Sequence, residues 1–193
     1  MLEEKTILGY WLKRARDQGE RAIGHADLPL EGQREMSDKT KKFIAEKCPT
    51  NLLTLDYGCG VGRYADLFEK YIGYDITEQF LRIARKNNPS KYFFQGVDPC
   101  LRTFDLDIEM FMSVTVLQHN SIPVVLGVFE SLAKHIKHPL TFCLLENTTA
   151  NAQHCKGRKP KTYIGLLEEF FKVTATSVCK FNGNHTLLIA KTK

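Results

Sequence analysis

The sequence predicts an α/β protein built on one doubly wound, seven-stranded and mostly parallel β-sheet. Short apolar runs alternate with amphipathic stretches along most of the chain, which is the pattern of repeated β-α-β units. A glycine-rich loop directly after the first apolar run is typical of sheets that bind a nucleotide-like ligand. Near the C-terminus, Asn182-Gly183-Asn184 separates two strand-like runs, which predicts a terminal antiparallel hairpin.

The individual elements follow from apolar spacing and from local stop signals. The helix over 36–47 is predicted by the helical spacing of its apolar residues, and Asn87-Asn88-Pro89 ends the helix that begins at Thr77. A proline in the first turn marks the start of the helix at 122. The predicted strands are 52–56, 71–75, 91–95, 108–114, 140–146, 172–181 and 185–192, and the predicted helices are 36–47, 61–70, 77–88, 122–136 and 161–170.

The stretch from Asp56 to Gly62 carries the most information about function. Gly58, Gly60 and Gly62 stand at every second position after Asp56, so no side chain keeps a ligand from the loop, and the helix predicted over 61–70 would face that ligand with its N-terminus. A second apolar run ends in Asp75, which is placed to accept both hydroxyls of a ribose. Together these features predict a nucleoside-type cofactor at the carboxyl ends of the first and fourth strands.

The glycine spacing distinguishes between two classes of cofactor. A dinucleotide site would share Asp75, but its fingerprint is G-x-G-x-x-G, which holds a pyrophosphate, so a nicotinamide dehydrogenase is disfavoured. S-adenosylmethionine has no pyrophosphate and carries an ammonium group that needs an anion such as Asp56. In this stretch the chain resembles the class I S-adenosylmethionine-dependent methyltransferases, whose D-x-G-x-G-x-G signature stands here at 56–62.

The resemblance covers roughly residues 38–193 and implies S-adenosylmethionine as the cofactor. It matches Asp98 to the adenine-binding acid of the family, although Val97 separates that acid from the preceding glycine here. It also matches residues 104–119 to the fourth strand and the turn that follows it in small members. The residues expected at the cofactor are Trp11, Arg14, Asp56, Gly58, Cys59, Gly60, Gly62, Arg63, Asp75, Ile76, Val97, Asp98 and Ser113.

The N-terminal segment 1–35 has two interpretations. Its Tyr10-Trp11-x-x-Arg14 is similar to the N-terminal segments of thiopurine-type methyltransferases, which fold over the cofactor as a lid, although their spacing is W-x-x-x-R. A lid would exclude water from the sulfonium. The alternative is a packing helix with the only tryptophan of the chain in the core. In either case we expect one methyltransferase domain over 1–193, with its sheet within 36–193.

Two further features bear on the acceptor. His119, in the turn after the fourth strand, is a candidate general base, but a turn histidine that bonds the backbone would look the same, and methyl transfer can proceed without a base. The basic run 156–161 is either a solvated loop or an element that recognises an anionic substrate. Since no aromatic residue interleaves the run, nucleic acid is not the favoured partner.

The composition is that of a globular protein with a mild positive charge. The 193 residues are 43% hydrophobic, and a net charge of +5 allows an anionic substrate without requiring one. No run approaches the ~20 apolar residues that span a bilayer, and the N-terminus does not resemble a signal peptide. The six cysteines form no C-x-x-C pair or metal-ligand pattern. We therefore expect reduced thiols, no metal, and a cytoplasmic protein that acts away from membranes.

The function predicted from the sequence is transfer of a methyl group from S-adenosylmethionine to an oxygen, nitrogen or sulfur of a small or medium-sized molecule. Two alternatives stay open, a methyltransferase that acts on nucleic acid and an S-adenosylmethionine-binding subunit or sensor without turnover. The sequence indicates neither the acceptor nor the oligomeric state.

Overall fold

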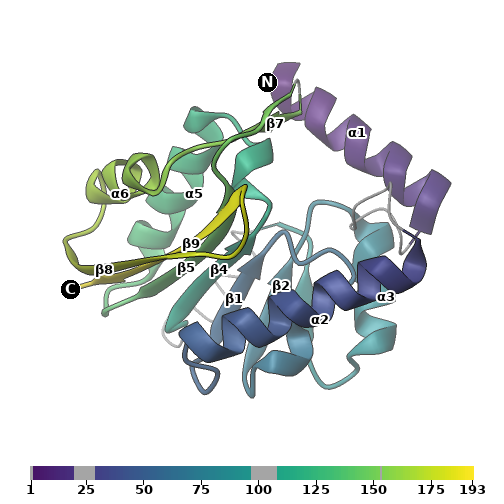
Figure 1. Cartoon of the computed structure of the whole chain (residues 1–193), viewed down its shortest axis with the longest axis horizontal. Coiled ribbons are helices and arrows are strands. Elements are labelled where there is room, and N and C mark those ends of the chain that lie inside the picture. The colour runs from purple at the N-terminus through teal and green to yellow at the C-terminus, as the bar shows by residue number, and fades with distance from the viewer. Residues whose placement is uncertain (1, 20–28, 97–107, 153) are drawn as a thin grey trace.

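The computed structural model of the chain describes residues 2–19, 29–96, 108–152 and 154–193. Its centre is a seven-stranded sheet with the order β3-β2-β1-β4-β5-β9-β8 (Figure 1). The first five strands in the chain are parallel, and β9 runs antiparallel to both β5 and β8. The strands are β1 (Thr54–Tyr57), β2 (Tyr71–Tyr74), β3 (Tyr92–Phe94), β4 (Met110–Val114), β5 (Thr141–Asn147), β8 (Val173–Lys180) and β9 (His185–Thr192). The predicted fold class, including the terminal hairpin, is confirmed.

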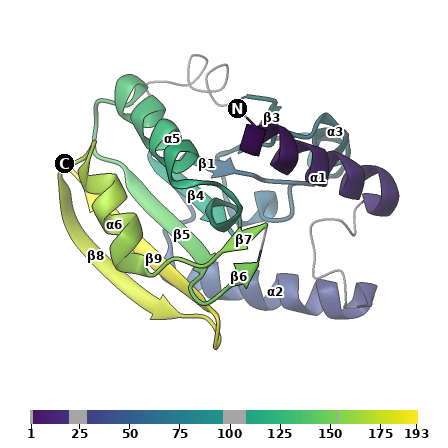
Figure 2. The same ribbon diagram turned by 90° about the horizontal axis from the view of Figure 1, so that it is seen from above.

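Helices cover both faces of this sheet, as the doubly wound pattern requires. The helices are α1 (Leu2–Gln18), α2 (Leu30–Lys47), α3 (Glu78–Asn87), α5 (Ile122–His135) and α6 (Pro160–Glu168). Buried side chains of α5 and α6 pack in one core cluster, and those of α2 and α3 pack in the other. In the view from above, α5 and α6 lie on one side of the sheet, α2 lies on the other, and α1 lies beside α3 (Figure 2).

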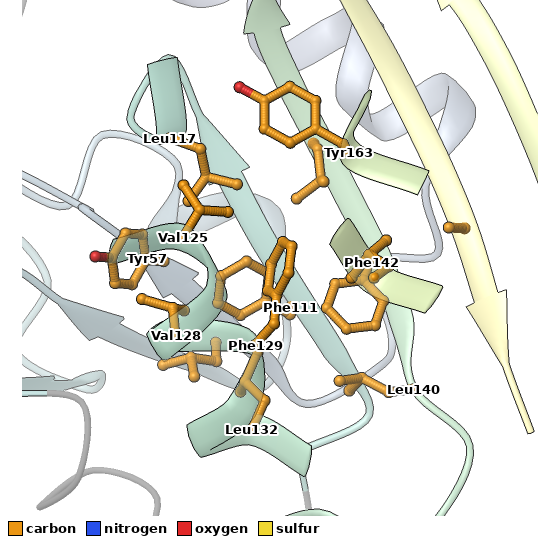
Figure 3. Close-up of a cluster of buried hydrophobic side chains, with 14 of the residues drawn as sticks. Tyr57, Phe111, Leu117, Val125, Val128, Phe129, Leu132, Leu140, Phe142 and Tyr163 are labelled. Carbon is orange, nitrogen blue, oxygen red and sulfur yellow. The ribbon is translucent and has the colours of Figure 1, made fainter. Parts of the chain in front are cut away.

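Alternation along the strands divides the apolar residues between the two clusters. Phe111 of β4 points toward α5, while its neighbours Met110 and Met112 join the opposite cluster. The ring of Phe111 lies 6.2 Å from that of Phe129 and 5.7 Å from that of Phe142, measured between centroids (Figure 3). This aromatic cluster buries the middle of the sheet and leaves the carboxyl ends of the strands to form a site.

The segment after the glycine loop differs from the prediction. No α-helix spans 61–70; the segment holds turns and one short 3-10 helix, η2 (Ala65–Leu67). The reason is local, because Gly60 and Gly62 have φ values of +56° and +72°, which a right-handed helix cannot accommodate. The glycine loop is therefore not followed by a helix N-terminus, and a ligand there would meet the loop itself.

Three smaller features complete the description. Helix α2 starts earlier than the predicted range 36–47, because it begins at Leu30 directly after Pro29. The polar loop after β5 contains a two-stranded hairpin, β6 (Asn151–Ala152) with β7 (Cys155–Lys156).

Among the described helices, none combines the length and the apolar character that crossing a bilayer requires.

Candidate active site

A pocket lies at the carboxyl ends of β1, β2 and β4, where the sequence predicts the ligand. The glycine loop contributes Gly58, Cys59, Gly60 and Arg63 to its lining. The other predicted site residues in its lining are Asp75, Ile76, Trp11 and His119, which come from β2, α1 and the turn after β4. The fold therefore brings together eight of the predicted site residues, from four separate parts of the chain.

The glycine loop is held by backbone hydrogen bonds and passes very close to the turn after β4. The N–H groups of Gly58 and Cys59 both donate to the carbonyl of Tyr74, each at 2.8 Å. Gly58 has a φ of +78°, and a Cβ there would lie 2.5 Å from the Cγ atoms of Val116. Only glycine fits this position, for both its conformation and its clearance.

Asp75 connects the end of β2 to the glycine loop. Its Oδ2 accepts a hydrogen bond from the Gly60 N–H at 3.0 Å, and its Oδ1 accepts one from the Thr77 N–H at 2.8 Å. Burial raises the pKa of Asp75, and these two backbone hydrogen bonds act in the opposite direction. Because each carboxylate oxygen can accept more than one hydrogen bond, Asp75 still has capacity for two ligand hydroxyls.

Asp56 is not among the residues that line the pocket, and its predicted contact with the cofactor ammonium stays a prediction. It lies within β1, opposite Gly73 of β2 and Met112 of β4, so its side chain points to a face of the sheet and not past its end. It is 1% exposed, and its Oδ2 accepts a hydrogen bond from the Tyr71 hydroxyl at 2.6 Å. Burial raises the pKa of Asp56 to about 7, against the lowering effect of that hydrogen bond.

Three other predicted cofactor contacts also lie outside the pocket lining. A Cβ on Gly62 would meet Asn88 and Phe93, so this glycine allows the loop to pack against α3 and β3. Ser113 is buried and donates its hydroxyl to Glu146. Arg14 donates to the Tyr10 hydroxyl at 2.8 Å and lies over the Trp11 ring. Val97 and Asp98 lie outside the described residues, so the adenine side of the prediction is not described.

Helix α1 forms one wall of the pocket. Trp11 lies in the lining and meets the ring of His119 edge-on, with the centroids 5.4 Å apart. One turn further along the same helix, Ala15 packs against Phe80 of α3. Helix α1 thus packs on the body of the protein through Ala15 and contributes Trp11 to the pocket lining.

His119 sits between the helix and the small hairpin. Its Nδ1 bonds the backbone carbonyl of His154, and its ring stacks on the His154 ring with centroids 5.9 Å apart. Because a carbonyl only accepts, Nδ1 carries the proton, and the lone pair of the neutral ring is on Nε2, which accepts from the Gln118 side-chain amide at 3.4 Å. Burial lowers the pKa of His119, so the ring is neutral near pH 7. This is the protonation state that a general base needs.

The structure adds functional residues that the sequence did not single out. Thr115 lines the pocket with a φ of +58°, and it is the only non-glycine residue with positive φ in the described part of the chain. Glu146, 1% exposed in the apolar strand β5, bonds the turn that Thr115 begins. An acidic residue at the end of an apolar run is a sequence signal for such a role, but its partners could not be read from the sequence.

The basic run 156–161 divides into two parts. Arg158 donates to the carbonyls of Leu117 and Asn120, in the turn that carries His119. The lysines at 156, 159 and 161 are exposed. Neither prediction for the basic run anticipated the contacts of Arg158, whose guanidinium donates hydrogen bonds to the protein backbone. In the described residues, no group of three or more His, Cys, Asp or Glu side chains is arranged to hold a metal ion.

No family model and no curated protein sequence matches the chain. Several solved structures, in contrast, match the chain. Magnesium protoporphyrin IX methyltransferase from Synechocystis PCC 6803, with S-adenosylhomocysteine bound, matches with a TM-score of 0.69 at 15% identity over 99% of both chains. Phosphoethanolamine N-methyltransferase 1 of Haemonchus contortus matches with a TM-score of 0.75 at 15% identity, over 98% of this chain and 49% of its own. Mitomycin 7-O-methyltransferase matches with a TM-score of 0.70 at 13% identity, over 95% of this chain and 60% of its own.

At these identities the likeness concerns the fold. The chain has the fold of the class I S-adenosylmethionine-dependent methyltransferases.

Proposed function

We propose that this protein is a methyltransferase that uses S-adenosylmethionine and acts on a small molecule. The observation that carries the proposal is the arrangement of Asp75 and the glycine loop. A buried carboxylate at the end of β2 is bonded to the Gly60 N–H, beside a loop that presents backbone and no bulky side chain. This is the arrangement that a ribose and an amino-acid tail require, and solved structures of the same fold hold S-adenosylhomocysteine.

The residues present fit this cofactor. Asp75 would accept the ribose hydroxyls, and Gly58, Cys59 and Gly60 would lie against the amino-acid end. Asp56 would act from behind the loop, where its bond to Tyr71 supports β1 and β2. S-adenosylmethionine, when bound, supplies an activated methyl group on a sulfonium. The chain itself then has to position the acceptor, exclude water and, where the acceptor is protonated, take up its proton.

The other wall of the pocket suits those tasks. Trp11 lies in the pocket lining, and in this proposal helix α1 acts as the lid that keeps water from the sulfonium. His119 is neutral near pH 7 and lies in the pocket lining, so its Nε2 is the candidate acceptor for a proton. Positioning supplies most of the rate in this scheme, because in-line transfer needs a close and aligned nucleophile.

A small molecule is the favoured acceptor. The pocket is lined mainly by strand ends and short loops of one domain, with Trp11 of α1 at one side. The guanidinium of Arg158 donates to two turn carbonyls, which leaves fewer of its N–H groups free to bind a phosphate of a nucleic acid. Similar structures are named for small molecules, magnesium protoporphyrin IX and phosphoethanolamine among them.

Calorimetric titration with S-adenosylhomocysteine tests the cofactor claim. We expect the wild-type protein to bind and Asp75→Ala to bind roughly 10- to 100-fold more weakly, because it loses charge-assisted hydrogen bonds to the ribose. The matched control is Asp66→Ala, an exposed aspartate of η2 outside the pocket lining, which should bind as the wild type does. No heat at high micromolar ligand, or equal affinities in Asp75→Ala and Asp66→Ala, would contradict the proposal.

A further inference from the structure

Glu146 is an ionisable residue in a position that favours an apolar one. It lies in β5 between β4 and β9, follows the apolar residues Phe142 to Leu145, and is 1% exposed. A buried carboxylate is costly unless several donors satisfy it. Burial raises the pKa of Glu146 to about 7, although its hydrogen bonds act to lower it. The donors around it therefore decide what this residue does.

The four donors to Glu146 belong to one short segment. Its Oε1 accepts from the Ser113 hydroxyl at 2.6 Å and from the N–H groups of Val116 and Leu117 at 3.3 and 3.1 Å. Its Oε2 accepts from the Gln118 N–H at 3.1 Å. Three consecutive backbone amides thus converge on one carboxylate, as in the concave anion-binding nests that backbone turns form. Removing the carboxylate would leave these amides without their acceptor.

The same segment is strained where it leaves β4. Thr115 has a φ of +58°, which is unfavourable for a β-branched residue and persists only when the surroundings impose it. The amides that follow Thr115 are those that Glu146 accepts from. Leu117, fully buried, anchors the turn in the aromatic cluster under α5 (Figure 3). The strained turn and the buried carboxylate stabilise each other.

Arg158 completes the arrangement from the other side. Its Nη1 donates to the Leu117 carbonyl at 2.8 Å and its Nη2 donates to the Asn120 carbonyl at 2.5 Å. The N–H groups of the turn therefore face a carboxylate, and two of its carbonyls face a guanidinium. His119 lies between Gln118, which donates to Glu146, and Asn120, which accepts from Arg158. Its ring lies in the pocket lining beside Trp11.

We propose that Glu146 and Arg158 are positioning residues that hold the turn 115–120, so that His119 and Asn120 face the acceptor space beside the cofactor. They act through the turn and touch no reacting atom. The role of His119 toward an acceptor rests on the proposed function, whereas the position of the turn can be measured without it. The hydrogen bonds that hold Asp75 and the glycine loop involve neither residue, so cofactor affinity should depend little on them.

Two probes within the turn test this proposal. The first is the pKa of His119 from NMR titration, with the signal assigned by its loss in His119→Asn. The second is the emission of Trp11, the only tryptophan of the chain, which contacts the His119 ring. In Glu146→Gln we expect the His119 pKa to rise from its lowered value toward about 6.5, the ordinary value. The emission of Trp11 should change with it, while the affinity for S-adenosylhomocysteine stays within about threefold.

The matched control is Glu130→Gln, an exposed glutamate of α5 paired with Lys134, which should leave both probes unchanged. Arg158→Lys keeps the charge but loses the two-pronged contact, and it should shift both probes in the same direction by a smaller amount. It also tests the proposal if Glu146→Gln fails to fold. The proposal would be overturned if folded Glu146→Gln kept the wild-type His119 pKa and the wild-type Trp11 emission. If Glu146→Gln does not fold, the same result in Arg158→Lys would overturn it. Failure of the wild type to bind S-adenosylhomocysteine would contradict the proposed function and leave these two probes readable.

Discussion

The two sides of the pocket are built in different ways. On the proposed cofactor side, Gly58, Gly60 and Asp75 come from one stretch of about twenty residues. The Gly58 N–H donates to the Tyr74 carbonyl, and the Gly60 N–H donates to the Asp75 carboxylate. On the proposed acceptor side, Trp11 of α1 and the turn after β4 line the pocket. The His154 carbonyl, next to the β6–β7 hairpin, bonds the His119 ring, and the side chains of Glu146 and Arg158 hold the turn. The first side depends on local backbone geometry, and the second depends on contacts between segments far apart in the chain.

This difference predicts how the two sides respond to substitution. A change in the glycine loop alters backbone geometry that no neighbouring side chain can restore, so cofactor binding should fail. A change on the acceptor side removes one of several contacts, so the cofactor should still bind with a modest loss. The following predictions run from the largest expected effect to the smallest.

The largest effect is expected for Gly58→Ala. An alanine at this position would have to adopt a positive φ, which is unfavourable for a non-glycine residue. Its methyl group would also lie 2.5 Å from the Cγ atoms of Val116, so the loop or the turn must move. We expect the affinity for S-adenosylhomocysteine to fall by about 100-fold or more, measured by calorimetry.

The control for this change is Gly127→Ala, in the exposed part of α5, where a Cβ meets nothing within 4 Å. It should leave binding unchanged and raise stability by roughly 0.5–1 kcal/mol, since alanine favours the helix. If Gly58→Ala binds as tightly as Gly127→Ala does, the cofactor side does not depend on the backbone of this loop.

The second prediction concerns the buried charge behind the loop and its effect on stability. The folded-state pKa of Asp56 is raised from 3.8 to about 7, so its stabilising contribution is complete below pH 4 and is lost as the pH rises through about 7. We expect Asp56→Asn to keep the Tyr71 hydrogen bond, to match the wild type near pH 4, and to exceed it at pH 8 by a free energy of unfolding on the order of 3 kcal/mol.

Urea unfolding at several pH values measures this difference. Asp66→Asn, at an exposed aspartate, is the control and should give a curve parallel to that of the wild type. A parallel curve for Asp56→Asn as well would mean that the carboxylate of Asp56 is ionised in the folded protein at little cost.

The smallest effect is expected on the acceptor wall. Trp11→Ala removes one aromatic side chain from the lining and its contact with His119, but it leaves Asp75 and the loop intact. We expect the affinity for S-adenosylhomocysteine to fall about fivefold, which corresponds to about 1 kcal/mol of lost aromatic contact. Leu12→Ala, at an exposed position next to it on α1, should have no effect on binding. Equal affinities in the two variants would show that α1 does not cover the bound cofactor.

Part of the site was predictable because its signals are local. The positive φ of Gly58 and Gly60 and the position of Asp75 follow from residue types and spacing within one β-loop-β unit. The same reasoning failed for the helix predicted over 61–70, because Gly62 also adopts a positive φ and interrupts a helical pattern. It did not anticipate the partner of Asp56, because alternation along β1 turns that side chain toward Tyr71.

Sequence alone sufficed for the order of the seven strands, for four of the five predicted helices, for the terminal hairpin, and for the placement of an acid at the end of the strand that follows the glycine loop. Each of these depends on neighbours in the chain, whose spacing sets their geometry. Only the tertiary structure decided what faces the loop. Trp11, His119, Glu146 and Arg158 meet because four separate segments pack at one end of the sheet, and the hydrogen bonds between them join residues about 30 to 40 positions apart. No spacing within the sequence encodes such contacts, because the packing of the whole core positions the groups that make them.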